Sequence, residues 1–222
     1  MMLSGARRAL VAAGAAVGAL LDPHRGDLVA LLGDTTAPPV LLDALLARMR
    51  RSEPGRRLLR DRPAVDASTV DMEALRALPD TTFGRQYARF MDTYGFHADE
   101  RSPVRFVDNP DHAFILQRYR QTHDFVHVLS GLPPTVLGEV SQKWFELLQT
   151  GLPMTALAAL VGPVRLPFAE QRALLTTFFP WAVRCSLSSQ FMLAVEFERH
   201  FDRDVDELRR DLGFVRAPLL SR

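Results

Sequence analysis

Two histidines and a neighbouring carboxylate in the second half of the chain have the types and spacing of a metal site. His123 and His127 are four residues apart, so on a helix they share one face, one turn above the other. Two imidazoles with this spacing can bind one divalent ion. Asp124 lies about 100° around the helix from His123, so it is a candidate ligand from the side or a partner of a ligand.

A predicted break in this helix brings a second carboxylate, Glu139, within reach. Pro133 and Pro134 cannot continue the hydrogen-bond ladder of a helix, so the chain is expected to reverse there into a second, antiparallel helix. His127 lies four residues before Gly131, and Glu139 lies five residues after Pro134, which places them at about the same height. Two nitrogen and two oxygen ligands suit Zn²⁺, with Fe²⁺, Mn²⁺ or Mg²⁺ as alternatives.

Other interpretations of these residues stay open. Histidines four apart also occur by chance, as surface or hydrogen-bonded core residues. Zincin metalloproteases use H-E-x-x-H, whereas this chain has the shorter Asp124 at the second position and no third-ligand pattern after it. An HD-type phosphohydrolase site would leave His127 and Glu139 without a role. Its residues would be His112, the His123-Asp124 pair, and Asp202 or Asp206.

Helical periodicity runs through most of the chain and predicts an all-α, single-domain helical bundle over residues 1–222, with the metal site on a helix–Pro-Pro turn–helix hairpin. Alternating strand patterns are missing, and prolines cluster between the periodic segments. Gly213 is a predicted helix stop. The predicted helices are Gly5–Leu21, Leu41–Arg51, Met72–Leu78, Gly84–Tyr94, Asp111–Ser130, Thr135–Thr150, Glu170–Val183 and Ser188–Leu212.

Composition excludes several classes of protein. The 222 residues carry 27 basic and 26 acidic side chains, and this balance gives no electrostatic argument for a nucleic-acid partner. A single cysteine, Cys185, excludes an intrachain disulfide and a multi-cysteine metal site. The longest charge-free stretches, Ala9–Leu21 and Leu147–Val164, are too short or too interrupted for a transmembrane helix.

Residues 1–21 allow two interpretations. They contain Arg7 and Arg8, no acidic residue and a run of small apolar residues, as a targeting segment would. No A-x-A cleavage pattern precedes the Asp22-Pro23 pair, so a first amphipathic helix that stops at this pair is favoured.

The pattern H-D-x-x-H, eleven residues, then E resembles the hallmark of the Coq-four family of ubiquinone (coenzyme Q) biosynthesis proteins. Val128 to Gly138 are the eleven residues. Further blocks resemble the family along almost the whole chain, at residues 22–36, 59–63, 83–91, 105–108, 117–120, 143–154, 162–166 and 180–183. The resemblance implies that His123, Asp124, His127 and Glu139 are zinc ligands and catalytic residues. It also implies that residues 1–21 are the first helix rather than a removable leader.

The resemblance further implies a metal-dependent lyase. This enzyme would remove the ring carboxylate, at position one, from a polyprenylated hydroxybenzoate or methoxybenzoate precursor. It would work with other ubiquinone-biosynthesis enzymes in a complex, bound peripherally to the matrix side of the mitochondrial inner membrane, or to the cytoplasmic membrane face in a bacterium. The alternative function is a non-catalytic, lipid-binding scaffold whose metal is structural.

Three residues just ahead of the motif are candidates for substrate binding. Arg118 and Arg120 could meet the carboxylate or a phosphate, although a solvated helix face explains them equally well. Tyr119 is one of several aromatic residues that could line a site for the prenyl tail, and plain core packing is the alternative. The charge-free stretch Leu147–Val164 is the expected membrane-facing part.

Overall fold

Helices account for every regular element in the computed structural model of the protein, which describes residues 4–22 and 25–219. Within these ranges the only strand-like pairing is one isolated bridge between Thr82 and Asp204. The all-α prediction is therefore confirmed. The helices are α1 (Gly5–Leu21), α2 (Gly26–Thr36), α3 (Pro39–Arg50), α4 (Glu53–Asp61), α5 (Met72–Ala77), α6 (Phe83–Tyr94), α7 (Pro110–Ser130), α8 (Val136–Thr150), α9 (Pro153–Val161), α10 (Phe168–Ala173), α11 (Phe179–Ser188) and α12 (Val205–Leu212).

The predicted helix Ser188–Leu212 is wrong for most of its length. After α11 the chain forms only two short 3₁₀ turns, Met192–Ala194 and Phe197–Arg199, before α12 begins. The apolar residues that suggested one long helix are instead buried on several sides of the chain. Asp204 begins α12 by accepting hydrogen bonds from the amides of Asp206 and Glu207, and α12 ends at the predicted Gly213.

Three helices were not predicted, namely α2, α4 and α9. The predicted helix Glu170–Val183 is one continuous helical path, in which a π-helical turn at Leu174–Phe178 joins α10 to α11. The ends of the other predicted helices differ from the observed ones by at most a few residues.

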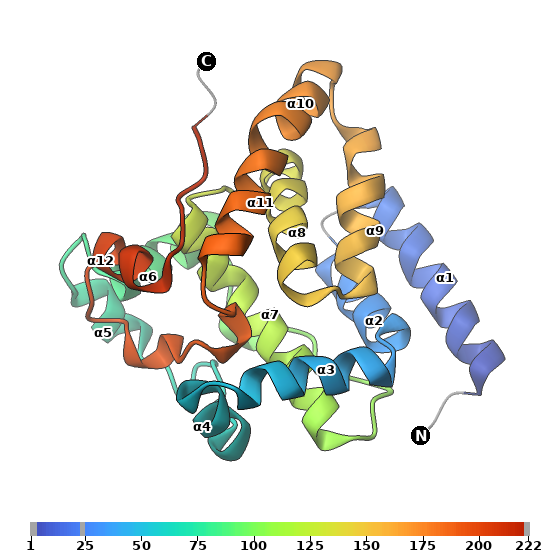
Figure 1. Cartoon of the computed structure of the whole chain (residues 1–222), viewed down its shortest axis with the longest axis horizontal. Coiled ribbons are helices and arrows are strands. Elements are labelled where there is room, and N and C mark those ends of the chain that lie inside the picture. The colour runs from blue at the N-terminus through green and yellow to red at the C-terminus, as the bar shows by residue number, and fades with distance from the viewer. Residues whose placement is uncertain (1–3, 23–24, 220–222) are drawn as a thin grey trace.

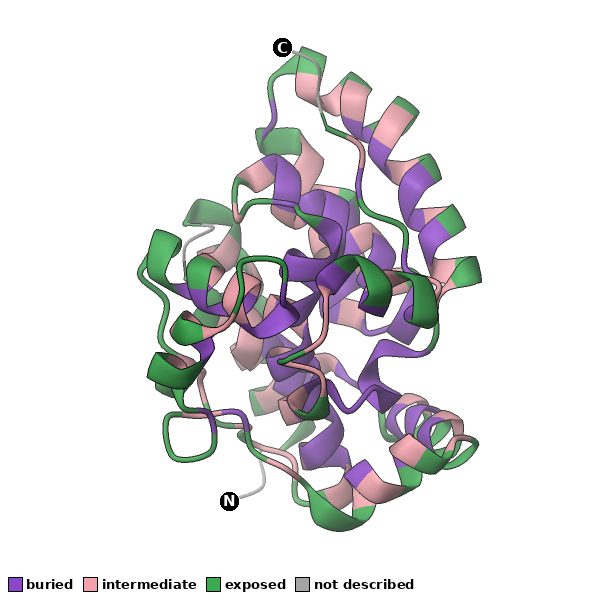
Figure 2. Ribbon diagram, turned by 90° about the vertical axis from the view of Figure 1, so that its left-hand side faces the viewer, coloured by how far each residue is buried: buried purple, intermediate pink, exposed green. Residues whose placement is uncertain are grey.

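Helix α7 lies at the centre of the fold (Figure 1) and takes part in two hydrophobic clusters. Its first half, through Ile115 and Leu116, packs with α2, α3 and α4. Its second half, through Phe125 and Leu129, packs with α6, α8, α11 and α12. Buried residues accordingly gather in the interior and exposed ones on the outer turns (Figure 2). The segment that carries the predicted site therefore lies between the two clusters.

Helix α1 has the predicted bounds and lies along the edge of the fold against α2 (Figure 1). Arg8 donates hydrogen bonds from Nε to the Thr35 carbonyl at 2.8 Å and from Nη2 to the Asp34 carbonyl at 3.0 Å. Pro23, half of the predicted stop, lies outside the described residues. No described helix is by itself long and apolar enough to cross a membrane, and α2 with α3 meets that test only as a pair bent by 97°.

Candidate metal centre

Local sequence signals build the hairpin formed by α7 and α8. Asn109 caps α7 by accepting hydrogen bonds from the amides of Asp111 and His112, and Pro110 occupies the first turn. Gly131 ends α7 in the left-handed conformation at φ +73°, where its amide donates to the His127 carbonyl. Thr135 then caps α8 through its hydroxyl group. At Gly138 a Cβ atom would lie 2.0 Å from the Pro133 carbonyl oxygen, so only glycine allows a turn this tight.

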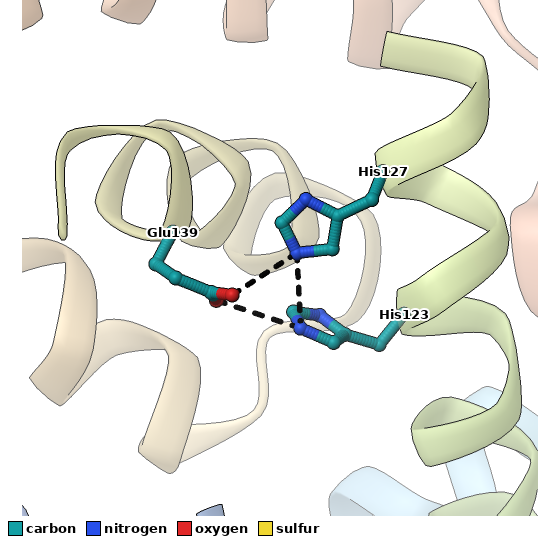
Figure 3. A group of neighbouring side chains, drawn as sticks. All are labelled: His123, His127 and Glu139. Atoms are coloured by element: carbon teal, nitrogen blue, oxygen red, sulfur yellow. Dashed lines mark hydrogen bonds and ion pairs between the residues drawn. The ribbon is translucent and has the colours of Figure 1, made fainter. Parts of the chain in front are cut away.

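Three predicted ligands converge across this hairpin (Figure 3). The Nε2 atoms of His123 and His127 are 3.3 Å apart. Glu139 Oε1 lies 3.1 Å from Nε2 of His127, and Glu139 Oε2 lies 3.5 Å from Nε2 of His123. The predicted match in height between His127 and Glu139 is thus observed.

The chemistry of these donor atoms fits a divalent ion. His127 Nδ1 lies 2.9 Å from the Leu132 carbonyl oxygen and His123 Nδ1 lies 2.6 Å from Glu146 Oε1, so each Nδ1–H has an acceptor. Both Nε2 lone pairs then point into the same space, which is unfavourable unless a cation or a proton lies between them. A tetrahedral Zn²⁺ with bonds of about 2.0–2.1 Å separates two nitrogens by about 3.3–3.4 Å, close to the observed spacing.

Two of the three side chains in this group are partly exposed to solvent. The His127 side chain is almost fully buried, whereas 19% of the His123 side chain and 35% of the Glu139 side chain are exposed. Phe90 of α6 stacks on the His127 ring at 5.3 Å between centroids. Three candidate ligands, two of them partly exposed, resemble catalytic zinc sites, which keep a position for water or substrate, more than structural sites closed by four protein ligands.

Electrostatic coupling holds this group in a charged state. Burial and the nearby Lys143 lower the pKa of His123, but Glu146 and Glu139 outweigh them and raise it to about 10. Burial raises the pKa of Glu139, but His123 and His127 outweigh burial and hold it well below its usual range. Without an ion, the cluster therefore carries a proton on His123 and a negative charge on Glu139, and a metal must displace that proton.

Asp124 lies outside this cluster. Its Oδ2 accepts hydrogen bonds from Arg101 Nη2 at 2.6 Å and Nε at 3.0 Å. Arg101 also donates to the Tyr87 hydroxyl and to the Val65 carbonyl. The rotation of about 100° between adjacent helical positions directs Asp124 toward this guanidinium and away from the two imidazoles. The structure thus brings together three of the four predicted ligands.

The HD-type arrangement is also not brought together in the part of the chain that the structure describes. His112 Nε2 lies 2.7 Å from Asp43 Oδ1 on α3. The single group of potential metal ligands found among the described residues contains His123, His127 and Glu139, and neither Asp202 nor Asp206.

Arg118 and Arg120 point into the protein rather than toward the cluster. Arg118 is fully buried, forms an ion pair with Glu198 and donates to the Val195 carbonyl. Arg120 forms an ion pair with the buried Asp34 and donates to the Ala30 carbonyl at 3.0 Å. Burial lowers the pKa of Arg120 and raises that of Asp34. The interpretation of these arginines as a solvated helix face is wrong, and their guanidinium groups are held by internal partners.

Comparison with known proteins assigns the family. A family model described as coenzyme Q (ubiquinone) biosynthesis protein Coq4 matches residues 1–218. The chain belongs to this Coq4 family. It is 43% identical over 213 residues to the mitochondrial ubiquinone biosynthesis protein COQ4 homologue of Bos taurus, covering 96% of this chain and 80% of the relative. The corresponding protein of Aspergillus terreus is 42% identical, with 97% and 75% covered.

A crystal structure from Nostoc punctiforme PCC 73102, of a protein named for ubiquinone biosynthesis, has the same fold. It superposes with a TM-score of 0.72 at 24% identity, covering 91% of this chain and 96% of that chain. The resemblance found in the sequence is thus confirmed. This Coq4-family protein has a role in coenzyme Q biosynthesis.

Three residues next to the cluster of this Coq4-family protein were not predicted from its sequence. They are Gln142, Lys143 and Glu146 of α8, and they surround the far side of the His123 ring. They follow Glu139 by three, four and seven residues. This spacing places all of them on the helix face of Glu139, and it is the feature of the sequence that could have indicated them. Lys143 is also the only lysine in the chain.

Tyr119 contacts Lys143 and Glu146 of α8 rather than the exposed part of the cluster. Its hydroxyl donates to Glu146 and accepts a hydrogen bond from Lys143 at 2.9 Å. Burial raises the pKa of Tyr119 well above its ordinary value. Tyr119 therefore lies behind His123, and the core-packing alternative describes its ring, which is 5% exposed.

Proposed function

We propose that this protein is a metal-dependent lyase that removes the ring carboxylate, at position one, from a polyprenylated hydroxybenzoate or methoxybenzoate precursor of coenzyme Q. The observation that carries the proposal is the convergence of two imidazole nitrogens and one carboxylate in a group that is partly exposed to solvent. Family membership supports the pathway, and the substrate class is part of the proposal.

The residues that would hold the ion are His123, His127 and Glu139. Zn²⁺ is the preferred ion for this nitrogen-rich set, with Fe²⁺, Mn²⁺ or Mg²⁺ as alternatives. When bound, the ion would supply a positive charge that orients and polarises the substrate carboxylate or an adjacent phenol oxygen. We expect Asp124 to act indirectly, because its ion pair with Arg101 fixes the helical turn that carries His123.

The chain's own residues would prepare the site for an aromatic acid. The hydrogen bonds from the two Nδ1 atoms hold both imidazoles in the orientation that leaves Nε2 free. Phe90 excludes water from one side of His127. Loss of carbon dioxide leaves the electron pair of the broken carbon–carbon bond on the ring carbon, which must then take up a proton.

A single-turnover assay tests the proposal. Purified protein with its metal content measured is given a prenylated hydroxybenzoate, and loss of the ring carboxylate is followed by mass spectrometry. We expect metal-dependent loss that disappears in His127→Ala while the helical circular dichroism is kept. A product with hydrogen at the ring carbon identifies a simple lyase, whereas one with a hydroxyl group identifies an oxidative reaction. Substrate binding without turnover at full metal occupancy would favour the lipid-binding scaffold.

We also propose that the protein acts at a membrane with the other coenzyme Q enzymes, on the matrix side of the mitochondrial inner membrane or, in a bacterium, on the cytoplasmic membrane face. The names of the curated relatives support the mitochondrial location. Exposed apolar side chains gather at the junction of α9 and α10, where Arg165 also contacts the end of α1. They are Leu160, Val164 and Phe168.

Vesicle binding tests this part of the proposal. The variant Phe168→Asp should sediment less with vesicles that contain phosphatidylglycerol, because a charge is expelled from the apolar interface. Val40→Asp is the matched control, since Val40 is similarly exposed and belongs to α3, which lies at the opposite end of the molecule from α10 (Figure 1). Equal binding of both variants and the wild type would refute this membrane contact.

A further inference from the structure

A buried network on α8 surrounds the Nδ1 atom of His123, on the side away from Glu139. Glu146 Oε1 lies 2.6 Å from Nδ1, Gln142 Nε2 lies 3.0 Å from it, and Lys143 Nζ lies 3.1 Å from it. All three side chains on α8 are nearly inaccessible to solvent. Burying a lysine and a glutamate is costly, and neither residue belongs to the two hydrophobic clusters.

These neighbours favour a proton on different nitrogen atoms of the His123 imidazole. Glu146 can only accept a hydrogen bond, so it favours a proton on Nδ1. Lys143 and the amide nitrogen of Gln142 can only donate, so they favour a bare Nδ1 and a proton on Nε2. A proton on Nε2 would occupy the atom that faces His127 and Glu139. The choice between the two tautomers therefore decides whether His123 can be a ligand.

The rest of the network favours Glu146 in this competition. Lys143 Nζ donates to Glu146 Oε2 at 2.8 Å and to the Tyr119 hydroxyl at 2.9 Å. Gln142 Nε2 donates to the backbone carbonyl of His123 at 2.8 Å and to Glu146 Oε1 at 3.1 Å. The donors thus have better acceptors than Nδ1, and the carboxylate makes the shortest contact with the ring.

We propose that Glu146 is a positioning residue that holds His123 in the tautomer with Nε2 free, and that Lys143, Tyr119 and Gln142 hold Glu146 in place for this task. This inference rests on the metal site of the proposed function. It adds a second layer to that site, since partners of this kind commonly tune metal affinity by about 10–100-fold.

Metal affinity of the full-length protein tests the inference without reference to turnover. Zn²⁺ binding is measured by competition with a chromophoric chelator, and folding of each variant is verified by thermal melting of the apo protein. We expect Glu146→Gln to bind Zn²⁺ about 10–100-fold more weakly than the wild type. Tyr119→Phe, which removes only a hydroxyl group, should weaken binding by less than about 10-fold.

A double variant separates tautomer control from a loss of packing. With Glu146→Gln in place, adding Lys143→Met removes the competing donor and should restore at least about 2-fold of the lost affinity. If the network were merely structural, the second substitution would weaken binding further. Asp34→Asn is the matched control, because Asp34 is another buried carboxylate paired with a residue of α7. Its Zn²⁺ affinity should equal that of the wild type.

The outcomes distinguish this inference from the proposed function. Wild-type affinity in Glu146→Gln, or an additive loss in the double variant, would overturn the role of Glu146 while leaving the metal site intact. A wild-type protein that takes up no divalent ion would overturn the site itself and both proposals. Weakened and partly restored binding in a protein without decarboxylation would support the role of Glu146 and refute the lyase.

Discussion

Metal binding should release a proton, and the protonation of His123 gives the expected number of protons released per ion. Burial and Lys143 oppose the charged form of His123, but Glu146 and Glu139 overcome them, and the pKa of His123 rises from 6.5 to about 10. Between pH 6 and pH 8 the imidazole therefore carries nearly one full proton. A metal ligand must be neutral, so this proton has to leave when an ion binds.

The pH dependence of the metal affinity follows from this release of a proton. Displacement of one proton makes the logarithm of the affinity rise by about one for each pH unit, or about 100-fold between pH 6 and pH 8. The same proton stabilises the folded apo protein, because the folded pKa lies above the unfolded value of 6.5. That contribution is complete below pH 6.5 and is lost as the pH rises through about 10, in the direction opposite to metal affinity.

Isothermal titration calorimetry with Zn²⁺ measures the number of protons released directly. Titrations at pH 7 in buffers with different ionisation enthalpies give the protons released per ion, and we expect about one from His123. The variant His123→Asn, in which this imidazole is absent, should release about one proton fewer and serves as the control. An unchanged affinity between pH 6 and pH 8, with no proton released by the wild type, would refute the assignment of His123 as a protonated ligand.

Four further predictions concern other parts of the chain. Glu139→Gln should weaken Zn²⁺ binding more than Asp124→Asn, because Asp124 faces Arg101, and chelator competition giving the reverse order would return Asp124 to the ligand set. Gly138→Ala should lower the free energy of unfolding by about 1–3 kcal/mol through its clash with the Pro133 carbonyl, and a urea midpoint equal to that of the wild type would contradict this. The native Cys185 thiol should resist a disulfide reagent at pH 8, because burial raises its pKa to about 12, and rapid labelling before unfolding would be inconsistent with that environment. Deletion of residues 1–21 should lower the melting temperature by at least about 4 °C, since it removes the packing of α1 on α2 and both hydrogen bonds of Arg8, and an unaltered melting curve would count against it.

The sequence by itself determined the features that depend on neighbouring residues. The spacing of His123 and His127, the break at Pro133-Pro134 and the distance to Glu139 were enough to predict the hairpin and three converging side chains. Helix periodicity and the stop at Gly213 were equally local. These predictions succeeded because helical geometry fixes the relative positions of residues a few places apart, whatever the rest of the chain does.

The tertiary structure alone decided which partner each polar group meets. Asp124 is paired with Arg101 from the loop before α7, and Arg118 with Glu198 from far beyond α8. The segment between Ser188 and α12 forms two 3₁₀ turns in place of an α-helix, and its Phe197 packs against Phe83 and Phe125 from α6 and α7. For a charged or apolar side chain, the sequence contains several residues that could be its partner. Only the packing of distant elements selects one of them. For this reason the convergence of His123, His127 and Glu139 could be predicted, whereas the partners of Asp124 and Arg118 could not.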